Sequence, residues 1–192
     1  MAESHPLEAR YSLTSSELLD AIDARFRARV TLEGAIAEVQ LGKDIERLRS
    51  VGTIERYERH DKDGHPDFTI WTPGGVEAGY LVECKNVRDH DEAYRAAGGI
   101  VAYKVETQKT RMSAGDPGSR FYSFGYFQIL AVCLGKKTGN WRQFMFAVAR
   151  DLAPRAGSPD KLAVFQRVPL PASKVDHPWY PSLEALLTSG RL

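Results

Sequence analysis

Two charged residues interrupt an apolar, strand-like run, and a third lies just before the preceding run. The stretch PDFTIWTPGGVEAGYLVECKN, residues 66–86, carries Asp67 ahead of the first run and Glu83 and Lys85 within the second. Side chains alternate along a strand with a period of two, so Glu83 and Lys85 point to the same face. If the Gly- and Pro-containing connection folds the two runs into a hairpin, the carboxylate of Asp67 lies beside that pair.

Three ionisable groups on one partly buried face need compensation, because removing a charge from water is costly unless the charge is paired. A divalent metal ion compensates for two carboxylates. Mg²⁺ takes oxygen ligands, usually from one or two carboxylates, and keeps waters that can attack a phosphate. The alternative is a surface ion pair between Glu83 and Lys85, which leaves Asp67 unexplained.

The segment that precedes the hairpin has a helical pattern over residues 15–49, beginning at a Ser cap with acidic residues in its first turn. Four-residue spacing predicts a first core-facing stripe, made of Leu18, Ile22, Phe26 and Val30. Thr31 is a candidate cap for a second helix. The apolar face of that second helix would consist of Leu32, Ile36, Val39, Ile45 and Leu48. Whether the two helices are continuous stays open.

The hairpin is flanked by further strand signals. IERYER (54–59) is a strand candidate, and HDKDGHP (60–66) separates it from DFTIW through an Asp-Gly turn signal. A short helical piece is expected around DEAYRAA (91–97), ended by two glycines. The alternation in IVAYKVETQ (100–108) favours a strand, with a helix as the alternative.

The second half of the chain holds two apolar runs, 124–134 and 141–150, which predict an antiparallel pair of strands in the core. The sheet should therefore have five or six strands. The Pro-rich end, with its final SLEALL helix, predicts an extended arm that folds back on the body. We expect a tail over 1–14, one domain over 15–170, and the arm with its short helix over 171–192.

The order of these elements resembles the PD-(D/E)xK nuclease superfamily, whose fold is called restriction-endonuclease-like. The matching residues are Pro66-Asp67 on the first hairpin strand and Glu83-Cys84-Lys85 on the second. A helix with GAIAE lies upstream of this motif, and a basic TQKTR segment lies downstream. The resemblance implies an α/β fold in which helices flank a mixed sheet of five to six strands.

The resemblance also implies roles for the motif residues. Asp67 and Glu83 would hold one or two Mg²⁺ ions, for which Mn²⁺ can substitute, and the backbone carbonyl of Cys84 would be a further ligand. Lys85 would position or deprotonate the attacking water and neutralise charge on the scissile phosphate. Glu38 matches the family's helix glutamate, which completes or supports the metal shell. Solvated helix-face glutamates are the alternative interpretation of this position.

Two questions about neighbouring residues stay open at this point. Glu33 competes with Glu38 as the helix glutamate. The connection before the first hairpin strand holds four residues of types that bind metals, namely His60, Asp61, Asp63 and His65. An Asp-Gly turn explains them more simply than a separate metal site. The segment also lacks the remaining ligands of an EF-hand loop.

Nucleic-acid contacts are expected downstream of the motif. The chain has 26 basic and 25 acidic residues, a net charge of +1, so only the local charge distribution can indicate a polyanionic partner. Residues 104–120 hold four basic and two acidic residues. Gln108 and Lys109 match the phosphate-contacting position of the family, and Arg111 and Arg120 are candidates for general backbone contacts. A solvated loop is the alternative.

Several classes of protein are excluded by what the sequence lacks. No apolar run reaches the roughly 18 residues of a membrane span, and the start of the chain lacks a basic flank with an apolar core. The two cysteines, Cys84 and Cys133, lie in apolar runs and are expected to be buried thiols. No CxxC pair, P-loop or GxSxG elbow occurs. We therefore expect a cytoplasmic protein without a membrane partner.

Together, these features predict a Mg²⁺-dependent endonuclease that cuts double-stranded DNA in restriction or defence. The alternatives are a role in DNA repair or recombination, an RNA substrate, or a DNA- or protein-binding module with the same fold and no turnover. A symmetric homodimer is one arrangement that would present a site to each strand of a duplex.

Overall fold

The computed structural model describes residues 5–62, 64–89, 91–109 and 115–192. These fall into two compact units that meet between Ile36 and Ala37. The second unit holds a mixed six-stranded sheet flanked by helices, so the predicted α/β fold class is confirmed.

The first unit consists of helices. They are α1 (Pro6–Tyr11), α2 (Ser15–Asp23) and the first part of α3 (Phe26–Ser50), which continues into the second unit. The expected tail over 1–14 thus contains a helix. The predicted core-facing stripe is wrong, since α1 and α2 bury no residue and the stripe's residues on α3, Phe26 and Val30, are 65% and 40% exposed. The helix ends at Asp23 and restarts at Phe26, which breaks the four-residue phase on which the prediction depended.

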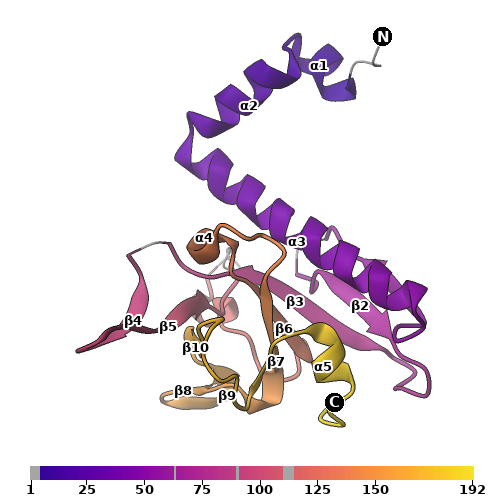
Figure 1. Ribbon diagram of the computed structural model, residues 1–192, viewed down its shortest axis with the longest axis vertical. Helices are drawn as coiled ribbons and strands as arrows, with labels where there is room; N and C mark the ends of the chain where they lie inside the picture. Colours follow the sequence, from indigo (N-terminus) through magenta and orange to yellow (C-terminus); the bar gives the residue numbers. More distant parts are fainter. Residues whose placement is uncertain (1–4, 63, 90, 110–114) are drawn as a thin grey trace. The chain divides into compact units, whose positions relative to one another are not determined.

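The central sheet of the second unit is formed by strands from three parts of the chain (Figure 1). In order across the sheet they are β1 (Arg56–Arg59), β2 (Phe68–Trp71), β3 (Tyr80–Asn86), β6 (Ile129–Cys133), β7 (Phe144–Val148) and β11 (Trp179–Tyr180). Only β3 and β6 are parallel neighbours; the other four pairs are antiparallel. The β2–β3 hairpin and the β6–β7 pair are as predicted, and β11 is where the C-terminal arm joins the sheet.

Smaller elements surround this sheet. They are the three-stranded sheet β10 (Phe165–Val168), β5 (Gly99–Glu106) and β4 (Ala93–Ala96), the pair β8 (Pro154–Arg155) and β9 (Ser158–Leu162), the short helices α4 (Gly135–Thr138) and α5 (Leu183–Leu187), and the 3-10 turns η1 (Pro117–Arg120) and η2 (Ala149–Asp151). The helix expected around DEAYRAA is wrong, because these residues form β4. Gly99, with φ of +118°, closes a hairpin that pairs β4 with β5, and this pairing overrides the local helical preference.

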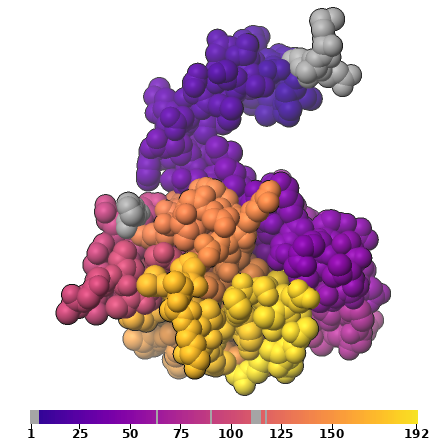
Figure 2. Space-filling view, viewed as in Figure 1, coloured from indigo at the N-terminus to yellow at the C-terminus, as the bar shows by residue number. Residues whose placement is uncertain are grey.

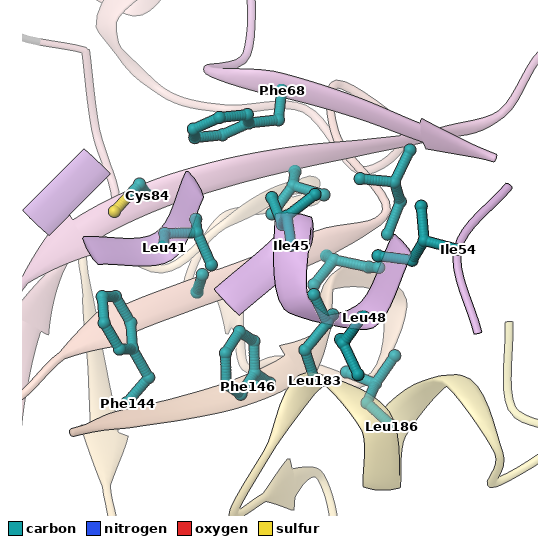
Figure 3. Close-up of a cluster of buried hydrophobic side chains, with 14 of the residues drawn as sticks. Leu41, Ile45, Leu48, Ile54, Phe68, Cys84, Phe144, Phe146, Leu183 and Leu186 are labelled. Carbon is teal, nitrogen blue, oxygen red and sulfur yellow. The ribbon is translucent and has the colours of Figure 1, made fainter. Parts of the chain in front are cut away.

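One face of the sheet packs against the second part of α3 and against α5 (Figure 3). The buried residues of α3 are Ala37, Leu41, Ile45 and Leu48. The sheet contributes Phe68, Val82, Cys84, Phe144 and Phe146 to the same cluster, and α5 contributes Leu183 and Leu186. In Figure 2 the C-terminal segment, in yellow, lies beside the purple surface of α3. Arg47 of α3 and Glu184 of α5 approach to 3.8 Å.

This packing corrects the predicted second stripe. Ile45 and Leu48 are buried as expected, but Leu32 and Val39 are 36% and 42% exposed. The buried face runs through Leu41 instead.

The opposite face of the sheet is buried too. Its cluster includes Val105, Tyr122, Phe127, Leu130, Val132, Leu162 and Val168. Because β6 is covered on both faces, all five of its residues are buried, which explains its uninterrupted apolar sequence. Both cysteines are buried free thiols, as expected. None of the described helices combines the length and the apolar character needed to cross a bilayer.

The corrected stripe of α3 can be tested by paired substitutions. Leu41→Ala should lower the free energy of unfolding by about 2–5 kcal/mol, because it opens a cavity at a fully buried site. Val39→Ala should change it by less than about 0.5 kcal/mol. Urea denaturation measures both, and equal losses would show that the buried face runs through Val39.

Candidate active site

The β2–β3 hairpin brings Asp67 and Glu83 together. Phe68 pairs with Val82, so one step back along β2 and one step forward along β3 place Asp67 opposite Glu83. The backbone N–H of Cys84 donates a hydrogen bond to Oδ2 of Asp67 at 2.7 Å. The short PGGVEAG connection therefore produces the neighbourhood that the sequence indicates.

Glu83 and Lys85 share the face of β3 that is turned away from α3. Lys85 Nζ lies 2.5 Å from Glu83 Oε1, and the two side chains are 24% and 5% exposed. The same carboxylate oxygen accepts a hydrogen bond of 2.5 Å from the hydroxyl of Tyr122. Glu83 is thus a buried carboxylate held by one cation and one hydroxyl donor.

Tyr122 is a site residue that the sequence reasoning missed. It is 3% exposed and lies 39 positions after Glu83, so no local spacing connects the two. The only available signal was the density of aromatic residues in FYSFGYF, which also fits an apolar strand. Burial and the charge of Glu83 raise the pKa of Tyr122, although the charge of Lys85 acts to lower it. The hydroxyl therefore stays a donor.

The electrostatics of the pair of carboxylates favour a cation. Burial and the charge of Glu83 raise the pKa of Asp67 to about 7, and Glu38 acts in the same direction. Burial acts to lower the pKa of Lys85, but the adjacent Glu83 outweighs burial and raises it above its ordinary value. The ammonium group of Lys85 is therefore charged, while the charge of Glu83 opposes the ionisation of Asp67.

This donor set fits a hard divalent ion. Two carboxylates are the number that Mg²⁺ commonly takes from a protein, with waters completing its shell. A bound cation would also relieve the repulsion that raises the pKa of Asp67. The thiol of Cys84 packs in the apolar cluster beside α3, so only its backbone is available to this site. Within the described ranges, no group of three or more His, Cys, Asp or Glu side chains is arranged to hold a metal.

Glu38 lies close to this centre but has another partner. Its Oε2 is 3.1 Å from Nη2 of Arg59, and its side chain is 30% exposed. Its charge raises the pKa of Asp67, yet it does not join Asp67 and Glu83 in a three-carboxylate group. Glu33, the competing choice, lies on the part of α3 that belongs to the first unit.

The downstream basic residues adopt a defined arrangement. The N–H of Lys109 donates to the carbonyl of Arg120 at 2.8 Å, and Nε of Arg120 donates to the carbonyl of Lys109 at 3.1 Å. The ammonium of Lys109 lies 4.2 Å from the ring centre of Tyr126. Gln108 donates to Glu106. Arg111 lies outside the described residues.

Two tyrosines connect this segment with the carboxylates. The ring of Tyr126 lies 5.0 Å from that of Tyr122, whose hydroxyl binds Glu83. A continuous row therefore runs from the cation of Lys109 through both rings to Glu83.

The histidine-containing connection before β2 forms a turn in its described part. The N–H of His65 donates to the carbonyl of Lys62 at 3.1 Å. His60 extends the β1–β2 ladder by donating its N–H to the carbonyl of Asp67 at 2.8 Å, and its Nε2 lies 2.8 Å from the hydroxyl of Thr69. The backbone contacts of this segment are thus those of a turn, and the side chain of His60 has Thr69 as its partner. Asp63 lies outside the described residues.

Comparisons with known proteins give limited similarity. No family model and no curated protein matches the sequence. Among solved structures, a bacterial homing endonuclease is similar at 17% sequence identity and a TM-score of 0.40, over 62% of this chain and 68% of that chain. Similarity at this level does not assign a function.

The raised pKa of Asp67 should make stability depend on pH in the metal-free protein. Its ordinary pKa is 3.8 and its folded value is about 7, so the stabilisation present at low pH is lost as the pH rises through about 7. Asp67→Asn cannot ionise, and its stability relative to the parent should increase from about pH 4 to about pH 8. Urea titrations with EDTA measure this difference, and a constant difference would contradict the raised pKa.

The bond between Tyr122 and Glu83 can be tested separately. Tyr122→Phe leaves the buried carboxylate with one donor fewer and should lower the free energy of unfolding by about 1.5–3 kcal/mol, the range for hydrogen bonds to charged groups. Tyr126→Phe is the matched control, because its hydroxyl binds the neutral carbonyl of Gly64 at 2.5 Å and should contribute about 0.5–1.5 kcal/mol. The bond to Glu83 would be unimportant if Tyr122→Phe were as stable as the parent.

Proposed function

We propose that this protein is a metal-dependent endonuclease that hydrolyses phosphodiester bonds in double-stranded DNA. The observation that carries the proposal is the convergence of Asp67, Glu83 and Lys85 on the paired strands β2 and β3. Restriction or defence is the setting we propose, and repair or recombination is the second candidate. The order and spacing of the three residues resemble the PD-(D/E)xK motif.

Asp67, Glu83 and the backbone carbonyl of Cys84 would hold Mg²⁺, and Mn²⁺ could replace it. When bound, the cation supplies an activated water and polarises the phosphate. The raised pKa of Asp67 means that this residue must give up a proton near neutral pH before both carboxylates can serve as ligands. Metal affinity should therefore depend on pH in this range.

The charged state of Lys85 favours one of its two candidate roles. A protonated ammonium cannot accept a proton from water, but it can neutralise negative charge that develops on the phosphate. Its contact with Glu83 sets the position of the ammonium beside the carboxylates. We assign Lys85 to orientation and charge stabilisation, and Tyr122 to holding Glu83 in place.

The basic residues downstream would bind the DNA backbone. Lys109 and Arg120 are tied together through their main chains, and the aromatic row places Lys109 on a path that leads to Glu83. Gln108 and Arg111 belong to the same proposed contact region. Two copies of the protein, related by a two-fold axis, would present one site to each strand.

The substrate can be established with a panel of nucleic acids. Purified protein should cleave plasmid and linear duplex DNA with Mg²⁺ and not with EDTA. Cleavage of RNA alone would assign the activity to the RNA alternative. Binding to duplex DNA without cleavage in either Mg²⁺ or Mn²⁺ would favour a binding module.

The division of labour between Glu83 and Lys85 gives a sharper test. Glu83→Ala should lose both metal binding and cleavage, whereas Lys85→Ala should bind Ca²⁺ at least as tightly as the parent, because a positive charge near the ion is removed. Each variant should cleave at least about 100-fold more slowly. Calorimetric titration with Ca²⁺ and a cleavage assay in Mg²⁺ measure the two quantities.

Glu46→Ala is a matched control for these substitutions. Glu46 also forms an ion pair, with Arg49 at 2.6 Å, but it lies on the exposed side of α3. This variant should bind metal and cleave like the parent. A Lys85→Ala protein that cleaves at the parental rate would reduce the Glu83 and Lys85 pair to a structural ion pair.

A further inference from the structure

The three-stranded sheet β10–β5–β4 carries two cations directly opposite each other. Lys104 on β5 is the register partner of Arg167 on β10, so both side chains point to the same face. Like charges in this relation destabilise a pair of strands. Within the described residues, neither side chain forms an ion pair that would offset the repulsion.

Aromatic rings hold these two cations without neutralising them. The guanidinium carbon of Arg167 lies 4.4 Å from the ring centre of Tyr94 on β4. The ammonium of Lys104 lies 5.5 Å from the same ring and 5.0 Å from the ring of Phe165. Contacts of this kind orient the cations over ring faces and leave their charge available to a ligand.

The acidic residues near this face are already engaged. Glu106 accepts from Arg88 at 2.8 Å and from Gln108. Glu92 lies 2.6 Å from the same Arg88. The hydrogen bond from Arg88 is the main cause that lowers the pKa of Glu92, and the charge of Lys104 has a smaller effect in the same direction. The positive charge of the Lys104 and Arg167 pair is therefore not cancelled by the carboxylates around it.

The opposite side of this three-stranded sheet packs against the core. Val105 and Val168 point to the other side of the sheet and are fully buried in the core cluster that contains Tyr122. Phe165 and Arg167, on the near side, are exposed. The pair therefore consists of an exposed guanidinium group on Arg167 and a half-buried ammonium group on Lys104, held between two aromatic rings. This arrangement suits an anionic group that is attached to a flat ring.

We propose that this face, formed by Tyr94, Lys104, Phe165 and Arg167, binds the sugar-phosphate backbone of a nucleic acid away from the cleavage site. A phosphate between Lys104 and Arg167 would accept from both and remove their mutual repulsion. Tyr94 and Phe165 offer apolar surface to the adjoining sugar or base.

The choice of a nucleic acid over another polyanion rests on the proposed function, and one structural fact supports it. β5 leads from Lys104 through Glu106 to Gln108 and Lys109, so the face continues along the chain into the segment proposed to contact DNA. Arg167 joins this surface from a strand 63 positions later in the sequence, which extends the proposed contact region beyond residues 104–120.

The test measures binding of a fluorescent DNA duplex by anisotropy in EDTA, at several salt concentrations. The double variant Lys104→Gln, Arg167→Gln should bind about tenfold more weakly than the parent, and the slope of log K against log salt should become shallower by about 0.9, because the one phosphate held between the two cations is lost. The double variant Arg56→Gln, Lys174→Gln is the control. It removes the same charge, and Arg56 likewise lies over a ring, 3.5 Å from the centre of Trp71.

A second variant distinguishes a loss of DNA binding from a loss of folding. Arg167→Glu places an opposite charge across from Lys104, which favours the strand pairing, so thermal unfolding should occur at or above the parental temperature while DNA affinity falls at least tenfold.

The outcomes separate this inference from the proposed function. Parental salt slopes in both variants, with cleavage by the parent intact, would overturn the inference alone. A parent that binds no nucleic acid would overturn both. Loss of binding to polyglutamate in the variants, without loss of binding to DNA, would assign the face to acidic polypeptides and overturn the nucleic-acid proposal.

Discussion

The site depends on one buried carboxylate in the middle of a sheet. Glu83 lies on β3, between β2 and β6, with 5% of its side chain exposed. An isolated charge at such a position is strongly unfavourable, so the surrounding structure has to supply partners. Lys85 provides a cation from the same face of the strand, and Tyr122 provides a hydroxyl from a distant segment. Asp67 adds a second carboxyl group beside Glu83, and these two groups are the side-chain ligands in the proposed metal site.

The apolar half of β3 sets the geometry of its polar half. Val82 and Cys84 are anchored in the cluster that contains Leu41 and Ile45 of α3. Because side chains alternate, a slip of one residue would turn Glu83 into that apolar cluster, so the register is strongly specified. The same register puts Asp67 opposite Glu83. Packing on one side of the sheet therefore determines which polar side chains meet on the other side.

Aromatic rings lie against cations in both proposed DNA-contact regions of this protein. Tyr122 and Tyr126 form the row that ends at Lys109, and Tyr94 and Phe165 hold Lys104 and Arg167. In both places a ring face lies against a cation and leaves its charge in place. The net charge of the chain is nearly neutral, but Lys104, Lys109 and Arg167 form local groups of cations. Contacts with aromatic rings set the positions of these cations.

What the sequence determined by itself was local. Period-two alternation and a Gly- and Pro-containing connection predicted the β2–β3 hairpin, and with it the approach of Asp67 to Glu83, because all of these lie within about twenty residues. What tertiary structure decided was which faces are buried and which distant groups meet. The stripe through Phe26 is exposed, residues 93–96 pair as a strand, and Tyr122 and Arg167 reach their partners from 39 and 63 positions away. Spacing along a chain encodes the direction of a side chain on its own element, but the surface it meets there depends on how the elements pack.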